Sequence, residues 1–336
     1  MKVMHFISSR GMGRGEVYVD LVNTLSKSIE TVLLVPKGAL YKDRVEDNVE
    51  VIEYYAYNRR NNPLLFLELW WKIKSIKPDI VHTHFGKASQ IFNVLNKVLK
   101  LPHVATKHNP RKGKIFNVLP HVIAVSNGVK ESIKNDNVNI IYNGVQPIEV
   151  GEKRKNNIFT LVAIGRLDKI KGFDILIREC AKLDFPYHLQ IVGEGEERKS
   201  LENLIHLLRL EEKITLLGFR KDIPQLMKDA DIVVMSSHSE GFSLVMVEAL
   251  FYANIFISTK VSGAVEILNE KFLIEGFHIS EKVREIHQNY DRRVKYFREL
   301  GEINRNKFLL THIAKEHIAY YQNILFQLEG ERQCEN

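Results

Sequence analysis

The chain has 336 residues, with 48 Lys and Arg against 41 Asp and Glu, and a formal net charge of +7. Its length exceeds one small core and predicts two domains, and its 45% hydrophobic and 26% charged content is typical of a globular protein. The moderate positive charge favours anionic ligands, such as phosphorylated substrates or acidic lipid heads, and does not imply nucleic acid. Two cysteines, Cys180 and Cys334, exclude a disulfide framework and favour a reducing compartment.

No apolar segment predicts a signal peptide or a membrane span. The first apolar run, residues 3–8, is too short for a secretory signal, and the stretch LLFLELWW at 64–71 is interrupted by Glu68. We therefore expect a cytoplasmic protein. Because Trp and Lys stand together in residues 64–74, this stretch could also be an interfacial helix at the inner face of the cytoplasmic membrane, although packing against a sheet is the favoured interpretation.

Short runs rich in Val and Ile alternate with amphipathic segments in the first half of the chain. The runs predict strands at 3–8, 31–36, 49–54, 80–85, 103–108, 121–126 and 139–144. Between several of them, apolar periodicity predicts helices at 16–27, 63–77 and 88–100. Such alternation is typical of a parallel sheet covered on both faces.

The pattern restarts after a polar segment at 146–157, which we interpret as a linker. A second set of strands is predicted at 159–165, 188–193, 214–218, 231–237 and 255–259. Helices are predicted between them at 173–183, 197–210, 222–230 and 243–252. From about residue 280 onward the chain is charged and helical only. We therefore predict an α/β protein with two Rossmann-like, doubly wound domains whose strand ends face one another across a cleft.

Two histidines lie at the end of the strand predicted at 80–85. Because side chains alternate along a strand, His82 and His84 should point the same way. Two histidines could bind a metal, but the sequence offers no third ligand beside them, so we predict no metal site.

Charged residues also follow two strands of the second half. Arg166 and Lys171 come after the strand at 159–165, where a guanidinium and an ammonium could hold a diphosphate, although a solvated loop is the simpler alternative. Glu240 follows the strand at 231–237, and Ser243 is the predicted cap of a helix that carries Glu248 on its second turn. The two carboxylates could accept hydrogen bonds from sugar hydroxyls on either side of a phosphate at the helix N-terminus.

Five segments stand in a recognisable order in the second half. They are GRLDKIKG at 165–172, VGEG at 192–195, LGF at 217–219, SEGFSLVMVEA at 239–249 and SGAVEIL at 262–268. This series resembles the retaining GT-B glycosyltransferases of family four, and the resemblance extends over nearly the whole chain. It implies an acceptor-side domain at 1–147, a nucleotide-sugar domain at 148–310, and a terminal helix at 311–330 that packs back on the first domain.

The resemblance implies a catalytic group formed by His84, Arg166, Lys171 and Glu240. In this family the two cations bind the donor diphosphate and stabilise its developing charge, and the carboxylate holds hydroxyls of the donor sugar. His84 would contact that sugar near the reacting carbon, with His82 packed behind it.

The resemblance also implies a larger donor-binding surface. Glu248 would hold the ribose, the backbone amides from Phe242 to Leu244 would lie against sugar and phosphate, and the LGFR turn would line the base. The remaining donor-side residues are Gly13, Arg14, Gly165, Gly193, Phe219, Arg220, Gly241 and Ser243. On the acceptor side the resemblance points to Lys107, His108, Arg111 and Lys112, which suit an acidic or phosphorylated acceptor.

Two positions depart from the family pattern. Arg14 stands where the second of two paired glycines is usual, and it could add a phosphate contact or narrow the site. Ala253-Asn254-Ile255 replaces a common Gly-x-Pro turn, which is a structural feature.

The implied activity is transfer of a hexose-type sugar from a UDP or GDP sugar to a glycan or lipid-linked glycan, with retention and without a metal or other cofactor. Such reactions serve assembly of cell-surface polysaccharide, lipopolysaccharide or glycolipid, and contact with an anionic membrane is compatible with them. The alternatives are a GT-B epimerase of nucleotide sugars, an inverting transferase, and a non-enzymatic anion-binding protein at a membrane surface. No nucleic-acid partner is expected.

Overall fold

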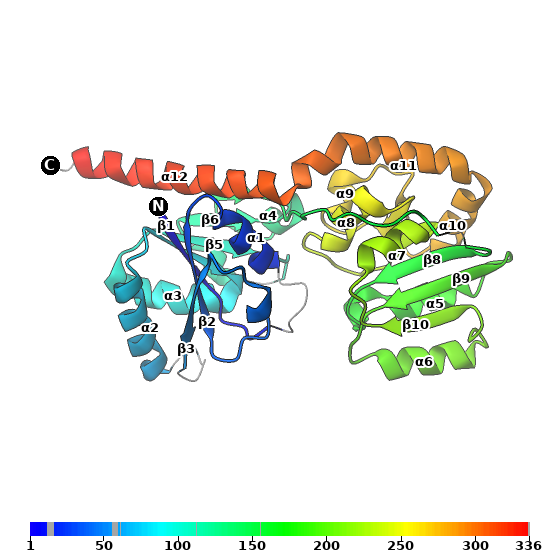
Figure 1. Cartoon of the computed structure of the whole chain (residues 1–336), viewed down its shortest axis with the longest axis horizontal. Helices are drawn as coiled ribbons and strands as arrows, with labels where there is room; N and C mark the ends of the chain where they lie inside the picture. Colours follow the sequence, from blue (N-terminus) through cyan, green and yellow to red (C-terminus); the bar gives the residue numbers. More distant parts are fainter. Residues whose placement is uncertain (12–16, 56–59, 61, 112, 155, 335–336) are drawn as a thin grey trace. The chain divides into compact units, whose positions relative to one another are not determined.

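A computed structural model describes residues 1–11, 17–55, 60, 62–111, 113–154 and 156–334. The chain divides into two compact units (Figure 1), the first formed by Met1–Gly144 with Leu310–Asn336 and the second by Val145–Leu309. The domain ends predicted at 147 and 310 stand beside these divisions, while the assignment of acceptor and donor to the units stays a prediction.

The first unit is built on a parallel sheet with strand order β3-β2-β1-β4-β5-β6-β7. The strands are β1 (Lys2–Phe6), β2 (Glu30–Pro36), β3 (Glu50–Tyr54), β4 (Ile80–His84), β5 (His103–Lys107), β6 (His121–Ala124) and β7 (Val138–Ile140). The chain runs outward from β1 to β3 and then returns to place β4 on the other side of β1. This reversal creates a topological switch point between β1 and β4, where ligands bind at the carboxyl ends of the strands in folds of this type.

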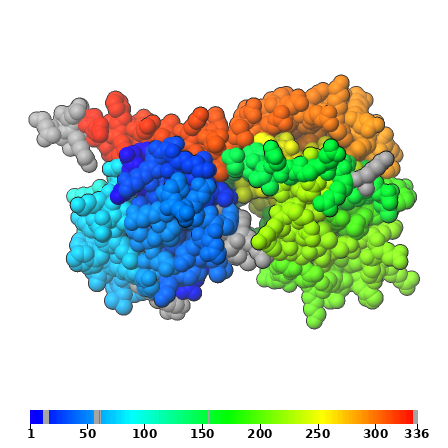
Figure 2. Space-filling model, in the orientation of Figure 1, coloured from blue at the N-terminus to red at the C-terminus, as the bar shows by residue number. Residues whose placement is uncertain are grey.

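Helices cover both faces of this sheet. Helices α2 (Pro63–Ile76) and α3 (Phe85–Leu99) pack on the face that carries Met4, Phe6 and Val81. Helices α1 (Val17–Leu25) and α12 (Leu310–Cys334) pack on the opposite face, on Val3 and Ile80, although α12 comes from the far end of the sequence (Figure 1). The outer side of α12 lies on the surface (Figure 2). Shorter elements are η1 (Lys42–Arg44), η2 (Lys114–Asn117) and α4 (Asn127–Glu131).

Helix α2 settles the interpretation of the most apolar stretch of the sequence. Asn62 caps the helix by accepting a hydrogen bond from the Leu64 amide, and Pro63 occupies the first helical position. Leu65, Leu69 and Ile73 are buried against the sheet, so the favoured interpretation of packing is confirmed. In the described part of the chain, no helix is long and apolar enough to cross a membrane.

The second unit repeats the architecture with the parallel order β10-β9-β8-β11-β12-β13. Its strands are β8 (Phe159–Ile164), β9 (Tyr187–Val192), β10 (Ile214–Gly218), β11 (Ile232–Met235), β12 (Phe256–Thr259) and β13 (Leu273–Ile274). Its helices are η3 (Lys169–Lys171), α5 (Phe173–Cys180), α6 (Arg198–Leu207), α7 (Ile223–Asp229), α8 (Leu244–Tyr252), α9 (Ala264–Ile267), α10 (Ile279–Gln288), α11 (Tyr290–Asn304) and η4 (Arg305–Phe308). The switch point of this sheet lies between β8 and β11.

The prediction of two Rossmann-like, parallel-sheet units is therefore confirmed, with local differences. Strand β7 ends at Ile140, so most of the predicted strand at 139–144 is not strand, and β11 ends at Met235, two residues before the predicted end at Ser237. Strand β13 was not predicted, because two residues are too few to show an alternating pattern.

Candidate functional site

In the second unit, the predicted catalytic residues gather at the switch point of the sheet. Arg166 and Lys171 follow β8, and Glu240 follows the neighbouring strand β11. The Lys171 ammonium contacts the Glu240 carboxylate at 2.6 Å, and the Ser237 hydroxyl donates to the same carboxylate oxygen at 2.7 Å. The topology thus brings together two predicted site residues that lie far apart in the sequence.

This ion pair is largely shielded from solvent. The side chains of Lys171 and Glu240 are 22% and 14% exposed. Partly buried charges are costly unless they are paired, so each residue compensates the other in the unliganded protein. A phosphate could replace Glu240 as the partner of the Lys171 ammonium, because it is an anion. Sugar hydroxyls could replace Lys171 as the partner of the Glu240 carboxylate, because they donate hydrogen bonds.

Asp168 organises the same loop, and the sequence analysis missed it. Its carboxylate accepts hydrogen bonds from the backbone amides of Ile170 and Lys171 at the start of η3, and from the Arg166 guanidinium at 2.7 Å. Arg166 itself remains 55% exposed. An aspartate directly before a short helical segment is a capping signal that could have identified this residue.

The predicted glycine Gly193 allows two loops to meet. It has φ +144°, and a Cβ there would lie 1.8 Å from the carbonyl oxygen of Gly165. Only glycine accommodates both this backbone conformation and this close approach. A structural requirement thus explains Gly193, and its predicted role in donor binding stays a prediction.

Helix α8 begins where the sequence predicted, with Glu240 and Gly241 in the preceding loop and Glu248 on its second turn. Ser243 is the N-cap residue, but its side chain makes no capping hydrogen bond. The Phe242 side chain is 5% exposed and packs near Phe308, so only its backbone remains for the predicted contact with ligand. The predicted amide contacts, which extend to Leu244, are compatible with this arrangement.

The turn after β10 carries the two residues predicted to line the base. Phe219 is 40% exposed, and its place beside the base stays a prediction. Arg220 is held by Asp222 through two hydrogen bonds of 2.9 and 2.7 Å. The guanidinium is therefore oriented by a carboxylate within its own turn.

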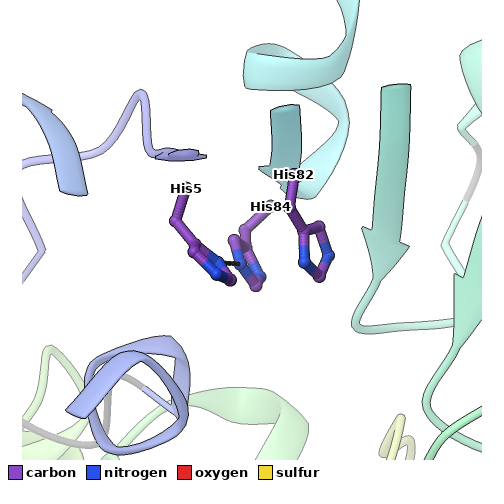
Figure 3. Close-up of side chains that lie close together, drawn as sticks. All are labelled: His5, His82 and His84. Carbon is purple, nitrogen blue, oxygen red and sulfur yellow. Dashed lines mark hydrogen bonds between the residues drawn. The ribbon is translucent and has the colours of Figure 1, made fainter. Parts of the chain in front are cut away.

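In the first unit, the histidines lie at the switch point between β1 and β4 (Figure 3). His5 of β1 pairs in register with His82 of β4, and His84 follows two residues later on the same face. The prediction that His82 and His84 point the same way is confirmed by their stacked rings, whose centroids are 4.3 Å apart. The sequence offered no third ligand beside these two histidines, but the topology supplies one, His5, which no sequence spacing reveals.

Ring nitrogens of these three histidines, one from each, lie within 4.8 Å of one another, close enough to hold a metal ion, although existing contacts would compete with it. The rings of His82 and His84 are 24° from parallel, so their in-plane nitrogen lone pairs run side by side. His82 also has both ring nitrogens engaged, one with the Tyr321 hydroxyl and one with the Thr106 hydroxyl, each at 2.6 Å. His82 thus lies behind His84, tied to α12 and β5, and a metal would have to displace one of these contacts.

Burial keeps the histidines of this cluster neutral. Desolvation lowers the pKa of His5 and of His108 to about 3, with a further contribution from His317. The same cause, followed by the neighbouring histidines, lowers the pKa of His84 well below its usual value. Each ring therefore carries one N–H at neutral pH.

Three of the predicted acceptor-side residues share one pocket. Lys107, His108 and Arg111 line it together with Arg60 and Lys87, within the first unit. Lys107 is 3% exposed and donates to the Ser132 hydroxyl at 2.7 Å, and burial lowers its pKa. The sequence analysis missed Arg60 and Lys87 because they belong to other segments of the chain. Gly13, Arg14 and Lys112 lie outside the described residues.

The turn into α3 is strained beside this pocket. Phe85, which lines the pocket, has φ +66°, a conformation that is unusual for a bulky residue. It lets the chain pass directly from the end of β4 at His84 into α3. Strain of this kind clusters at functional sites, which agrees with the position at the switch point.

Comparison with solved structures defines the fold. The crystal structure of HepE from Anabaena, in complex with UDP and glucose, matches with a TM-score of 0.82 at 19% identity, over 96% of this chain and 100% of that one. A glycosyltransferase from Rickettsia africae matches with a TM-score of 0.80 at 21% identity, over 96% and 98%. The fold is that of the GT-B glycosyltransferases.

Comparison of sequences defines the family. Residues 13–148 match Glycosyltransferase Family 4, and residues 146–305 match Glycosyl transferases group 1. The uncharacterized glycosyltransferase MJ1178 of Methanocaldococcus jannaschii is 30% identical over 267 residues, which cover 70% of this chain and 73% of that protein. The chain belongs to the group 1 glycosyltransferases.

Other relatives carry more specific names. N-acetylgalactosamine-N,N'-diacetylbacillosaminyl-diphospho-undecaprenol 4-alpha-N-acetylgalactosaminyltransferase of Campylobacter jejuni is 32% identical over 178 residues, 47% of this chain and 49% of that protein. The lipopolysaccharide core biosynthesis glycosyltransferase LpsE of Rhizobium meliloti is 23% identical over 275 residues, 78% and 80%.

Proposed function

We propose that this protein is a retaining glycosyltransferase that moves a hexose-type sugar from a UDP or GDP sugar to a phosphorylated or lipid-linked glycan. The product would enter cell-surface polysaccharide, lipopolysaccharide or glycolipid. The names of the relatives from Campylobacter and Rhizobium support this class of acceptor.

The ion pair between Lys171 and Glu240 at the switch point carries the proposal. One site offers a cation to the donor diphosphate and a carboxylate to the donor sugar. A nucleotide sugar has a diphosphate and a sugar in one molecule. On binding, its diphosphate would contact Lys171 and its sugar would contact Glu240, in place of the contact between the two side chains. The UDP and glucose bound by HepE, which has the same fold, support a ligand of this kind.

In the proposed reaction the bond between the anomeric carbon and the leaving phosphate oxygen breaks. Arg166 and Lys171 stabilise the charge that develops on the diphosphate. The acceptor hydroxyl attacks from the same face, and the departing phosphate takes its proton, so both the proton and the electron pair end on the nucleotide. Because two side chains supply the positive charge, we propose that no divalent metal is required.

The basic pocket of the first unit supports a phosphorylated acceptor. Lys87, Lys107 and Arg111 come from separate elements and would surround an anionic group there. A lipid-linked acceptor would be met at a membrane surface. The exposed Leu64 and Trp71 of α2 support a transient contact with it.

The test is turnover of the purified full-length chain with a panel of UDP and GDP sugars and a diphospho-polyprenol glycan, in EDTA. Transfer with the donor's anomeric configuration, read by NMR of the product, is the expected result. An inverted product would identify an inverting transferase, and conversion of the donor without an acceptor would identify an epimerase. A complete loss in EDTA that metal restores would contradict the role given to the two cations.

A further inference from the structure

The loops that follow β8 and β11 are tied together through their backbones. The Ser236 hydroxyl donates to the Lys171 carbonyl at 2.8 Å, and the His238 amide donates to the Ile170 carbonyl at 2.8 Å. These contacts lie beside the two residues whose side chains form the ion pair, Lys171 and Glu240. The two backbones are therefore held together, and a ligand can part the ion pair only by moving side chains.

The side chain of Lys171 is confined as well. Its carbon chain lies over Gly165, where a Cβ would be 3.2 Å from Cε and 3.3 Å from Cδ. Both distances are shorter than a normal contact between carbon atoms, so the missing side chain of Gly165 makes room for the lysine. The ammonium is 22% exposed and lies 2.6 Å from the Glu240 carboxylate. An anion that binds this ammonium must therefore do so beside Glu240.

The two cations of the site differ in what each would leave behind on binding an anion. Arg166 is paired with Asp168, but that carboxylate also accepts hydrogen bonds from two backbone amides of η3. Asp168 would therefore keep two charge-assisted hydrogen bonds. Glu240 accepts from Lys171 and from the Ser237 hydroxyl, and no other described residue donates to its carboxylate. Glu240 would keep one hydroxyl and lose its only cation.

Ligands with and without a sugar would meet this carboxylate differently. A nucleoside diphosphate can bind the ammonium, but it also places further negative charge beside Glu240, which is 14% exposed. A largely buried carboxylate that is left without its cation is costly. A nucleotide sugar brings the same diphosphate together with hydroxyls, which donate hydrogen bonds to a carboxylate. Of the two ligands, only the nucleotide sugar therefore compensates both halves of the ion pair.

We propose that the Lys171–Glu240 ion pair makes this site select an intact nucleotide sugar over the nucleoside diphosphate that transfer leaves behind. When the sugar departs with the acceptor, Glu240 loses its hydroxyl partners and attracts Lys171 again. The carboxylate then competes with the product diphosphate for the ammonium, and this competition favours release of the product. The inference rests on the proposed function for the identity of the donor.

The test is isothermal titration calorimetry of the full-length protein with UDP, UDP-glucose, GDP and GDP-mannose. For the base that the site accepts, we expect the nucleotide sugar to bind at least about tenfold tighter than its diphosphate. Equal affinities, or a tighter diphosphate, would overturn the inference and leave the proposed donor in place. Binding of none of the four nucleotides would contradict the proposed function, and the inference with it.

Two matched substitutions separate the ion pair from net charge. Glu240→Gln and Asp168→Asn each remove one carboxylate charge beside a cation of the site. We expect Glu240→Gln to tighten binding of the diphosphate about tenfold, because no unpaired carboxylate results, and Asp168→Asn to change it by less than about threefold. If Glu240 only holds the sugar, the diphosphate affinity of Glu240→Gln would stay unchanged, and the inference would be wrong. Equal tightening in both variants would also overturn it, because that would identify a general effect of charge.

Ser237→Ala tests the same coupling without a change of charge. It removes the hydrogen bond that the Glu240 carboxylate would keep when a diphosphate binds Lys171. We expect the diphosphate to bind about fivefold weaker and the nucleotide sugar to change by less than about twofold, because the sugar hydroxyls remain as donors. Unchanged or tighter diphosphate binding would contradict the coupling. Thermal unfolding checks each variant, and if Glu240→Gln fails to fold, the wild type and Ser237→Ala still decide.

Discussion

Lys171 and Glu240, which contact one another, are proposed to bind different parts of the donor. Lys171→Ala removes the cation that would stabilise the leaving diphosphate, and we expect kcat to fall about 100-fold. Lys169→Ala is the matched control, because Lys169 lies two residues away and is exposed. Steady-state kinetics and thermal unfolding of both variants check this. Near-normal turnover of Lys171→Ala would contradict the assignment of Lys171 to the donor diphosphate.

The backbone of Gly193 leads to a prediction about the stability of the fold. Gly193→Ala would place a methyl group against the Gly165 carbonyl in a backbone conformation that alanine avoids. We expect the free energy of unfolding to fall by about 1–3 kcal/mol from the backbone alone, and further from the clash. Gly330→Ala, on α12, has nothing within 4 Å and should instead stabilise by about 0.5–1 kcal/mol. Urea unfolding of both variants measures the difference, and equal effects would contradict the packing argument.

At the scale of the elements, helix α12 contacts the sheet of the first unit through a hydrogen bond as well as through apolar packing. Tyr321 and His82 are both fully buried, and the tyrosine hydroxyl lies 2.6 Å from the imidazole. Tyr321→Phe keeps the ring and leaves His82 with an unpaired nitrogen, so we expect a loss of about 1–3 kcal/mol in urea unfolding. Tyr55→Phe, at an exposed ring, should change nothing measurable. A Tyr321→Phe protein as stable as the wild type would show that the contact does not hold the helix.

Helix α2 presents an apolar outer face that the sheet does not use. Trp71 is 64% exposed, and Leu64 and Leu67 on the same helix are exposed beside it. If this face contacts a membrane, Trp71→Ser should lower the fraction bound to anionic vesicles about tenfold. Phe326→Ser, at an exposed position of α12, serves as the control. Sedimentation with phosphatidylglycerol vesicles measures both, and identical binding of the two variants would reject α2 as the contact.

The order of elements was predictable because buried parallel strands are continuous Val and Ile runs, and amphipathic helices separate them. The site was predictable where a local motif marks it, as at Lys171 and Glu240. It was not predictable where the fold alone makes the contact. His5 meets His84 because β4 returns beside β1. Strand alternation assigns a face to a histidine, but it does not tell which strand lies next to it.

At the scale of the whole molecule, buried neutral histidines are concentrated in the first unit. Desolvation lowers the pKa of His5, His103 and His108 to about 3 and that of His317 to about 4. Among the described histidines of the second unit, only His188 shows a lowered pKa, again from desolvation. The two units should therefore respond differently to acid.

The sign of that response follows from where the protons bind. Between pH 6.5, the ordinary pKa of histidine, and about pH 3, the pKa of His5 and His108 in the folded unit, the unfolded chain binds protons that the folded unit does not bind. The stability of the first unit is thus fully present above pH 6.5 and is lost as pH falls toward 3, by up to about 1.4 kcal/mol per pH unit for each histidine. Both tryptophans, Trp70 and Trp71, lie on α2, so their fluorescence follows the first unit alone. We expect the urea midpoint measured by tryptophan fluorescence to fall steeply from pH 7 to pH 5. The urea midpoint of the circular-dichroism change that comes from the second unit should fall less. Parallel shifts of the two signals would mean that the buried histidines do not control acid stability.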